Sequence, residues 1–214
     1  MSNRFLYGMK FILATKQHMT QLFDEDGRVH PATVLAAGPV RVTQVKTKER
    51  DGYRALQAGF GAQKPQRLSA QVRGHLKDLG AFRTLREFRV PESEEAPERG
   101  AVLDVSQFSA GERVRVSAIS KGKGFQGVVK RHGFKGGPRS HGQKHSEREP
   151  GSIGGGGRSG GRVIKGMRMA GRMGGERVTV RNLTVLGTDP SSHTLLLRGA
   201  VPGRRGTLVE VRGL

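Results

Sequence analysis

The stretch Arg113-Val114-Arg115-Val116-Ser117-Ala118 alternates polar and apolar residues and stands at the start of a long basic, glycine-rich segment. Alternation with a period of two is typical of a strand that buries one face. Strand-like patterning resumes only at residues 178–185, after the glycine-rich segment. The sequence therefore predicts a β-structured body that is interrupted by one long excursion.

Short strands separated by turn signals flank this stretch on both sides. Before it, strand patterns cover residues 9–19, 32–35, 40–47 and 53–60. After the excursion they cover residues 178–185, 193–198 and 207–211. Turns are predicted where Gly, Pro, Asp and Ser gather, at residues 23–28, 37–39, 51–52 and 188–191. Many short strands joined by turns favour a small closed β-barrel, which leaves no exposed sheet edge.

Two segments before the stretch break the strand pattern. Leu68, Val72, Leu76 and Leu79 are spaced by four, four and three residues, which predicts a short helix ending at Gly80, within an insertion at about 62–82. Residues 91–100 form an acidic linker that contains two prolines. We therefore expect a mainly β chain in three parts. Residues 1–116 form the first part of the barrel body, 117–181 form the long loop with its flanking strand ends, and 182–214 complete the barrel.

The basic charge and the glycines are concentrated in the loop. The chain has 38 Lys and Arg against 18 Asp and Glu, a net charge of +20, and 33 glycines. Residues 117–181 hold 15 of the basic residues, only three acids and 18 of the glycines. Such a segment cannot offset its ordering entropy by burying its own apolar surface. Its charge favours a polyanion as the partner that orders it.

The composition also excludes several classes of site. The chain has no cysteine, which removes disulfide scaffolds, Cys nucleophiles and Cys-ligated metal sites. The apolar run near the start, residues 11–14, is far too short for a signal peptide or a membrane span. We expect a soluble, intracellular chain with no membrane partner.

A flexible solvated loop is the simplest alternative interpretation of residues 117–181. Apolar residues stand among the charges, however, and a solvated spacer has no need of them. They are Phe125, Val128, Val129, Phe134, Ile153, Val163, Ile164, Met167 and Met169. Arg and Lys neutralise phosphates, glycine allows close backbone approach, and Phe and His stack on unpaired bases. The loop therefore predicts a nucleic-acid contact.

Three motifs in the loop imitate other sites. Residues 122–127 match the G-x-G-x-x-G pattern of nucleotide-binding loops, but no helix and second strand follow, and no kinase motif accompanies them. His141 and His145 have metal-ligand spacing only on a helix, which Pro138, Gly142 and Pro150 disfavour. The glycine run 154–157 and the following Arg-Ser-Gly-Gly-Arg fit an RNA-binding tract and a bare hinge equally well. We predict no catalytic residue, no metal and no cofactor.

Several short motifs stand in a fixed order along the chain. They are Met19-Thr20-Gln21, Phe23-Asp24-Glu25-Asp26-Gly27, Phe108, Ala118-Ile119-Ser120-Lys121-Gly122-Lys123-Gly124, Gly127, Arg131, Pro150-Gly151-Ser152-Ile153-Gly154, Met169-Ala170-Gly171-Arg172-Met173-Gly174, Glu176-Arg177-Val178-Thr179-Val180 and Arg198-Gly199-Ala200-Val201-Pro202-Gly203. In this order and spacing they resemble the bacterial type of the large-subunit ribosomal protein L3 family, over nearly the whole chain.

The resemblance implies a fold and a role. The fold is an SH3-like translation-protein β-barrel with a small α-helical insertion and a long extended loop. The role is that of a non-catalytic constituent of the large ribosomal subunit in the cytoplasm. It binds the large-subunit (23S-type) rRNA early in assembly, reaches toward the peptidyl transferase centre with its loop and contacts neighbouring ribosomal proteins. No small-molecule substrate is implied.

The resemblance also implies which loop residues contact RNA. The outgoing limb carries Lys121, Lys123, Lys130, Arg131, His132 and Lys135. The return limb carries Lys165, Arg168, Arg172 and Arg177. The tip, near the peptidyl transferase centre, holds Ile153, Gly154, Gly155 and Arg158. Further RNA contacts are expected from Arg139, His141, Lys144, Arg148 and Arg162.

Three positions depart from the family pattern. Arg115 stands where the family prefers Asp or Asn, and it adds positive charge at the root of the loop. His18 replaces a glycine before Met-Thr. Gly155 replaces a glutamine that is methylated in some relatives, so that modification is excluded at this position.

Two other functions are compatible with parts of the sequence. A free RNA chaperone would use the same loop without a ribosome, binding many RNAs with similar affinity and a steep salt dependence. An enzyme is favoured only by the isolated glycine motif. We expect the ribosomal role, because the ordered motifs resemble that family over nearly the whole chain.

Overall fold

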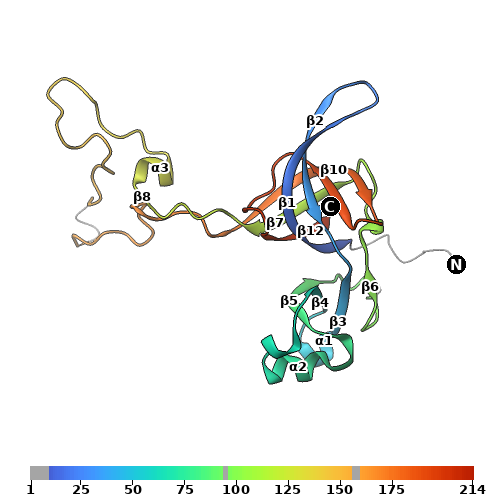
Figure 1. Ribbon diagram of the computed structural model, residues 1–214. Helices are drawn as coiled ribbons and strands as arrows, with labels where there is room; N and C mark the ends of the chain where they lie inside the picture. The colour runs from blue at the N-terminus through green and yellow to red at the C-terminus, as the bar shows by residue number, and fades with distance from the viewer. Residues whose placement is uncertain (1–9, 94–95, 156–159) are drawn as a thin grey trace. The chain divides into compact units, whose positions relative to one another are not determined.

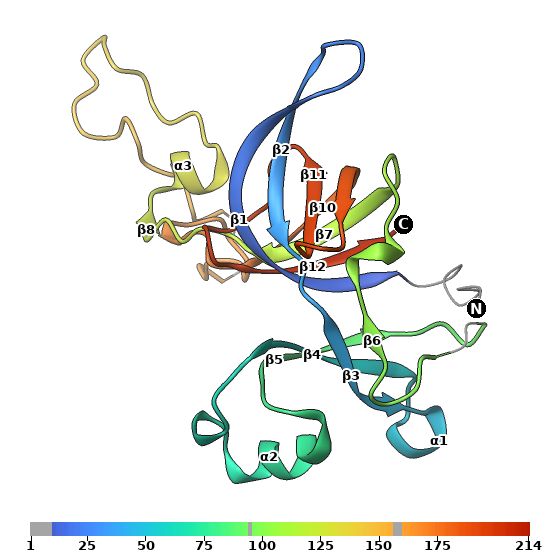
Figure 2. The ribbon, with the colours of Figure 1, turned by 45° about the vertical axis from the view of Figure 1, so that its right-hand side comes forward.

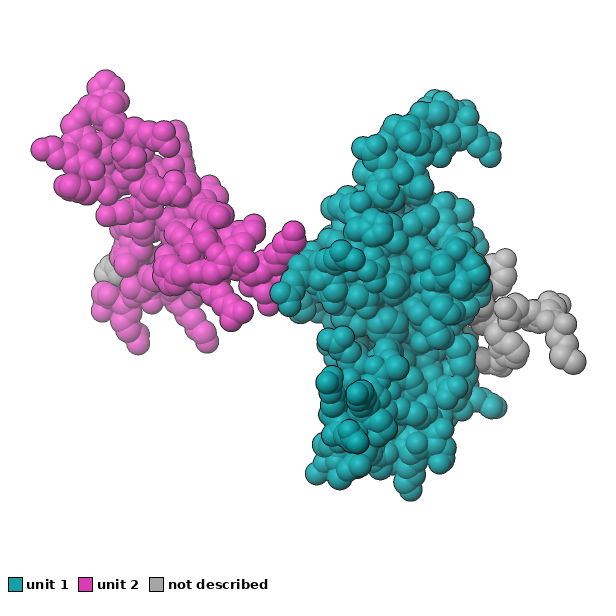
Figure 3. All heavy atoms as spheres, viewed as in Figure 1, with its two compact units in different colours: residues 1–119, 177–214 teal, residues 120–176 magenta. Residues whose placement is uncertain are grey.

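The computed structural model describes residues 10–93, 96–155 and 160–214. The chain divides into two compact units, residues 1–119 with 177–214 (unit 1) and residues 120–176 (unit 2); Figure 3 shows them in teal and magenta. Strands dominate and helices are few, so the prediction of a mainly β chain is confirmed.

Six antiparallel strands of unit 1 close into a barrel (Figure 1). In order around it they are β1 (Phe11–Phe23), β12 (Leu208–Gly213), β7 (Arg113–Ile119), β10 (Arg177–Asp189), β11 (Thr194–Arg198) and β2 (Val29–Ala36), and β2 pairs back with β1. The alternation at 113–118 is realised in β7, where Val114, Val116 and Ala118 are buried. Because their period is two, these side chains enter the barrel while the arginines between them face outward.

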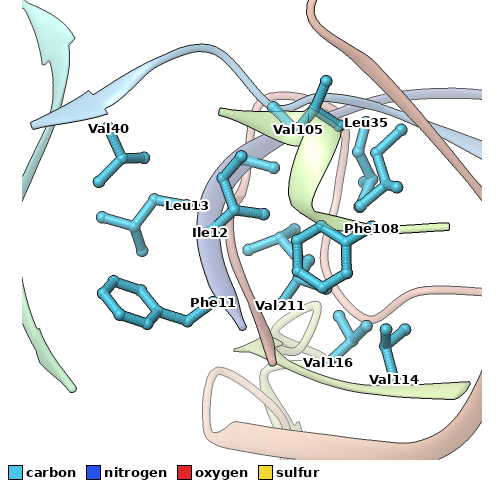
Figure 4. Close-up of a cluster of buried hydrophobic side chains, with 14 of the residues drawn as sticks. Phe11, Ile12, Leu13, Leu35, Val40, Val105, Phe108, Val114, Val116 and Val211 are labelled. Atoms are coloured by element: carbon cyan, nitrogen blue, oxygen red, sulfur yellow. The ribbon is translucent and has the colours of Figure 1, made fainter. Parts of the chain in front are cut away.

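The barrel core is formed by side chains from distant parts of the chain. Val116 of β7 lies opposite Val211 of β12. Phe108, which directly follows the 3₁₀ turn Val105–Gln107, is buried in the same cluster. Figure 4 shows these residues packed with Ile12 of β1 and Leu35 of β2. The core therefore joins the first, middle and last segments, although residues 120–176 separate β7 from β10.

A second sheet lies between β2 and β7 in the sequence. Its order is β5 (Phe82–Arg89), β4 (Ala55–Ala62), β3 (Val40–Lys46) and β6 (Val102–Leu103). The sequence pattern places residues 40–47 and 53–60 in the barrel body, whereas in the structure they pair in this separate sheet. The pattern also misses β5. Phe88 of β5 stacks on Phe11 of β1, with ring centroids 4.1 Å apart, which joins this sheet to the barrel core.

The predicted helix near Leu68 is shorter than its apolar spacing suggests. α2 spans Ala70–Leu76, and Val72 donates its N–H to the side chain of Ser69 at the helix start. A positive φ of 25° at Lys77 ends the α-helix, and a 3₁₀ turn at Lys77–Leu79 continues to Gly80. A further 3₁₀ turn covers Pro65–Arg67, and a single helical turn, α1 (Lys48–Asp51), ends at Gly52.

Unit 2 has little regular structure. It contains β8 (Phe125–Gln126), β9 (Gly171–Arg172) and α3 (Val128–His132), and its other described residues are turns and extended chain. Val128 is its one buried hydrophobic residue among those described.

Candidate nucleic-acid interface

The two limbs of unit 2 run antiparallel at its base. Ser120 donates its N–H to the carbonyl of Glu176 at 2.8 Å. Farther along, Lys123 donates its N–H to the carbonyl of Met173, and Met173 donates its own N–H to the carbonyl of Gly124, each at 2.9 Å. β8 and β9 then pair as Phe125 with Arg172. Gly174 has a φ of +71°, and a Cβ there would collide with the carbonyl oxygen of Lys121. Glycine is therefore required where the limbs pass closest.

α3 is fastened to the return limb by two predicted RNA-binding side chains. Arg131 donates from Nη1 to the carbonyl oxygen of Met169 at 2.7 Å, and His132 Nε2 lies 3.0 Å from the same oxygen. Both residues are half-buried. Their observed contacts are internal, and they hold the outgoing limb against the return limb.

An aromatic cluster lies beside this contact. The guanidinium of Arg168 stacks over the ring of Phe134 at 5.0 Å from its centroid, and the His132 ring lies 6.0 Å from Phe134. A cation over an aromatic face is attracted by the ring quadrupole. Arg168 is nevertheless exposed, so its remaining N–H donors face solvent.

The remaining predicted cations of unit 2 are on its surface. Eleven of its twelve described Lys and Arg residues are exposed, Arg131 being the exception. They are Lys121, Lys123, Lys130, Lys135, Arg139, Lys144, Arg148, Arg162, Lys165, Arg168 and Arg172. Of these eleven cations, only Arg139 forms an ion pair with a described residue. Its guanidinium lies 4.0 Å from the carboxylate of Glu147, and its side chain is 86% exposed. These cations therefore remain available to phosphates.

The apolar side chains of unit 2 are also largely uncovered. Phe125 is 76% exposed and Ile164 is 63% exposed, and Ile153, Val163 and Met167 are exposed as well. A surface that combines free cations with bare aromatic and aliphatic groups suits an RNA fold, where phosphates and splayed bases lie side by side.

Of the four residues predicted at the tip, three are described. Ile153, Gly154 and Gly155 are exposed, and the hydroxyl of Ser152 donates to the carbonyl of Gly154 at 2.8 Å. Arg158 lies outside the described residues. His141 is exposed, with a positive φ of 62°.

Arg177, the last predicted site residue, belongs to unit 1 and is engaged with Glu210. Its Nη1 and Nη2 donate to the two carboxylate oxygens of Glu210, the first at 2.9 Å, and this hydrogen bonding raises the pKa of the arginine. Glu210 is buried, and Arg86 Nε lies 3.4 Å from its Oε1. The bidentate pair joins the start of β10 to β12 within unit 1.

Two arginines near the Arg177–Glu210 pair, Arg86 and Arg212, were not among the site residues predicted from the sequence. Arg212 lies opposite Arg115 across β12 and β7, and it stacks over Phe88 at 4.7 Å. Burial, followed by the nearby charge of Arg115, lowers the pKa of Arg212. The sequence signal that could have found Arg212 is its alternation, with Glu210, against Val209 and Val211. This alternation places both charged side chains on the outer face of the last strand.

The structure gives no support to the nucleotide-binding and metal-site interpretations, and the glycine run at 154–157 lies partly outside the described residues. Residues 122–127 run along the outgoing limb into α3, which has only five residues, and β8 pairs antiparallel with β9 rather than within a βαβ unit. In residues 10–93, 96–155 and 160–214, no three His, Asp or Glu side chains gather as a metal site requires. No helix of the described part is long and apolar enough to cross a membrane.

Comparison with known proteins gives the family. A family model described as ribosomal protein L3 matches residues 89–192. The large ribosomal subunit protein uL3 of Acidothermus cellulolyticus is 51% identical over 206 residues, which cover 95% of this chain and 92% of the relative. The protein of the same name from Roseiflexus sp. is 52% identical over 202 residues, covering 94% and 95%. A third, from Thioalkalivibrio sulfidiphilus, is 50% identical over 204 residues, covering 94% and 95%. With identity of this level along nearly its full length, the chain belongs to the ribosomal protein L3 family.

Proposed function

We propose that the chain is a structural constituent of the large subunit of the bacterial ribosome, in the cytoplasm, and that it binds large-subunit rRNA through unit 2. The role is architectural and not enzymatic. The barrel of unit 1 would be the SH3-like barrel of translation proteins. Within residues 117–181, residues 120–176 would form the loop that enters the RNA, and 117–119 and 177–181 would be its flanking strand ends in β7 and β10; residues 182–214 would complete the barrel. The tip at Ile153, Gly154, Gly155 and Arg158 would lie toward the peptidyl transferase centre.

The observation that carries the proposal is the surface of unit 2. Its cations are exposed and nearly free of acidic partners, and among its described hydrophobic residues only Val128 is buried. A segment of this kind gains stability mainly from a partner. Phosphate neutralisation releases counterions, and the exposed Phe125 and Ile164 would be covered by bases.

The internal contacts of unit 2 fit this role. Arg131 and His132 fasten α3, and the limb ladder at residues 120–126 and 171–176 shapes the base, so the loop meets RNA partly organised. Preorganisation lowers the ordering cost that binding must offset. Arg131 and His132 would thus organise the loop, Arg177 would hold the start of β10 within unit 1, and the exposed cations would contact the phosphates.

The test is the salt dependence of binding to large-subunit rRNA. The loop variant replaces four exposed lysines of unit 2 by alanine, namely Lys123, Lys135, Lys144 and Lys165. The control variant removes four exposed cations of unit 1, namely Lys64, Arg67, Arg73 and Arg83. We expect the loop variant to make the negative slope of log K against log salt shallower by about three, at roughly 0.7–0.9 per phosphate contact. The control should change it little.

Equal changes in both variants would contradict the assignment to unit 2. Sedimentation completes the test, because a tagged chain that is absent from large subunits after a high-salt wash would contradict the ribosomal role itself. Equal affinity for an unrelated RNA of the same length would instead indicate a general RNA-binding protein.

A further inference from the structure

The hairpin formed by β1 and β2 runs past the end of the barrel (Figures 1 and 2). β12 pairs with β1 only from Phe11 to Thr15, and β11 pairs with β2 only from Ala32 to Ala36. Beyond these points, residues 21–23 pair with residues 29–31 and with no further strand in the described chain, and Met19 and Thr20 have β2 as their one paired neighbour. An isolated two-stranded ribbon is marginally stable in water, so a tip that stands free calls for an explanation.

One face of this ribbon carries uncovered apolar side chains on either side of Gln21. Phe23 lies opposite Val29, and Met19 lies opposite Thr33, so these side chains share a face. On β2, Thr33 and Leu35 belong to this face and are buried in the barrel. The same face of β2 is therefore buried at Thr33 and Leu35 and exposed at Val29, near the tip of the ribbon. Phe23 is 70% exposed, and Met19 and Val29 are each about half exposed.

The tip of the ribbon is acidic, although the chain as a whole is strongly basic. Asp24, Glu25 and Asp26 are consecutive, and Arg28 is the only Lys or Arg from residue 17 to residue 32. Asp24 shapes the turn, accepting the N–H of Arg28 at 2.7 Å and lying 3.0 Å from His30 Nε2. Asp26 has only a 3.8 Å contact with Arg28, in which both side chains are more than two-thirds exposed, and Glu25 is exposed as well.

We propose that this ribbon, residues 19–31, docks a Lys- and Arg-rich segment of another protein. The segment would lay apolar side chains on Met19, Phe23 and Val29 and direct its cations to Glu25 and Asp26. RNA is disfavoured because these carboxylates repel phosphates. The outer edge of β1 from Met19 to Phe23 offers backbone groups to an extended partner chain. This inference rests on the proposed function only in that a ribosomal subunit brings such basic segments close.

The test places a photo-crosslinking residue, p-benzoylphenylalanine, at Phe23 of the full chain assembled into purified large subunits. Sequencing of the crosslinked peptide by mass spectrometry is expected to identify another protein, through a peptide of net positive charge. A crosslink to RNA, a crosslink to a second copy of this chain, or no crosslink would each overturn the docking proposal.

A charge reversal makes the test quantitative. Glu25→Lys with Asp26→Lys is expected to lower the yield of that crosslink about five-fold or more, because two exposed ion pairs are replaced by repulsion. The control carries the same charge change elsewhere in unit 1, as Glu49→Lys with Asp78→Lys, and should leave the yield unchanged. Equal losses in both variants would overturn the role of the acidic tip.

The two proposals fail in different ways. Absence of the unaltered chain from large subunits would refute the proposed function. Normal incorporation combined with a crosslink from residue 23 to RNA would refute only the docking surface.

Discussion

Glu210 is the one charged residue that is buried in the described part of the chain. A buried carboxylate is stable only when it is paired and hydrogen-bonded. Arg177 supplies the bidentate partner from β10 and Arg86 adds a second cation from β5. This pair therefore joins the strand that receives the return limb of unit 2 to the last strand of the barrel.

We predict that Glu210→Gln lowers the free energy of unfolding by about 2 kcal/mol, because the arginines keep their charge while the amide offers no negative charge and one acceptor oxygen in place of two. Urea unfolding followed by circular dichroism measures it. The exposed Glu49→Gln is the matched control and should change stability by less than about 0.5 kcal/mol. Equal, small effects for both variants would contradict the structural role of Glu210.

Asp189 predicts a dependence of stability on pH. Hydrogen bonds from Ser191 and Ser192 lower the pKa of this carboxyl to about 2, below the value of about 3.9 in an unfolded chain. A depressed pKa stabilises the fold above about pH 4, and this contribution is lost as the pH falls through 2.

Thermal unfolding between pH 5 and pH 2 should therefore show a smaller loss of stability for Asp189→Asn than for the unaltered chain. The same loss in both proteins would show that the turn contributes nothing to the acid sensitivity.

Among the secondary-structure elements, alternation predicted the barrel strand β7 because one of its faces lies toward the core, with Val114, Val116 and Ala118 buried. β5 was missed because only Phe88 of its residues is buried and its pattern is weak. The separate second sheet could not be inferred, since strand pairing depends on contacts between distant residues that no local pattern records.

Gly174 gives a test of the limb pairing in unit 2. We expect Gly174→Ala to speed hydrogen exchange of the Lys123 and Met173 amides about ten-fold, because the added Cβ collides with the backbone of Lys121. Gly166→Ala is the matched control, because Gly166 also has a positive φ, +87°, but has open space around it. It costs a similar backbone strain, about 1 kcal/mol, without the collision. Equal effects on these two amides would contradict the close passage of the limbs.

For the whole molecule, the sequence indicated the chemistry of the proposed interface but not which of its residues make internal contacts. The exposed cations could be predicted, because charge and glycine content are local properties. The internal roles of Arg131 and Arg177 could not, because their partners Met169 and Glu210 lie 38 and 33 residues away. Composition identifies which residues suit RNA, and packing decides which of them are free to reach it.

Stabilisation of unit 2 by rRNA is measured by hydrogen exchange of residues 120–176 in the free chain and in purified large subunits. Few buried side chains protect unit 2 on its own. We predict fast exchange of these residues in the free chain, strong protection in the subunit, and a much smaller change in the barrel strands. Exchange of residues 120–176 at the same rate in both states would contradict stabilisation by rRNA.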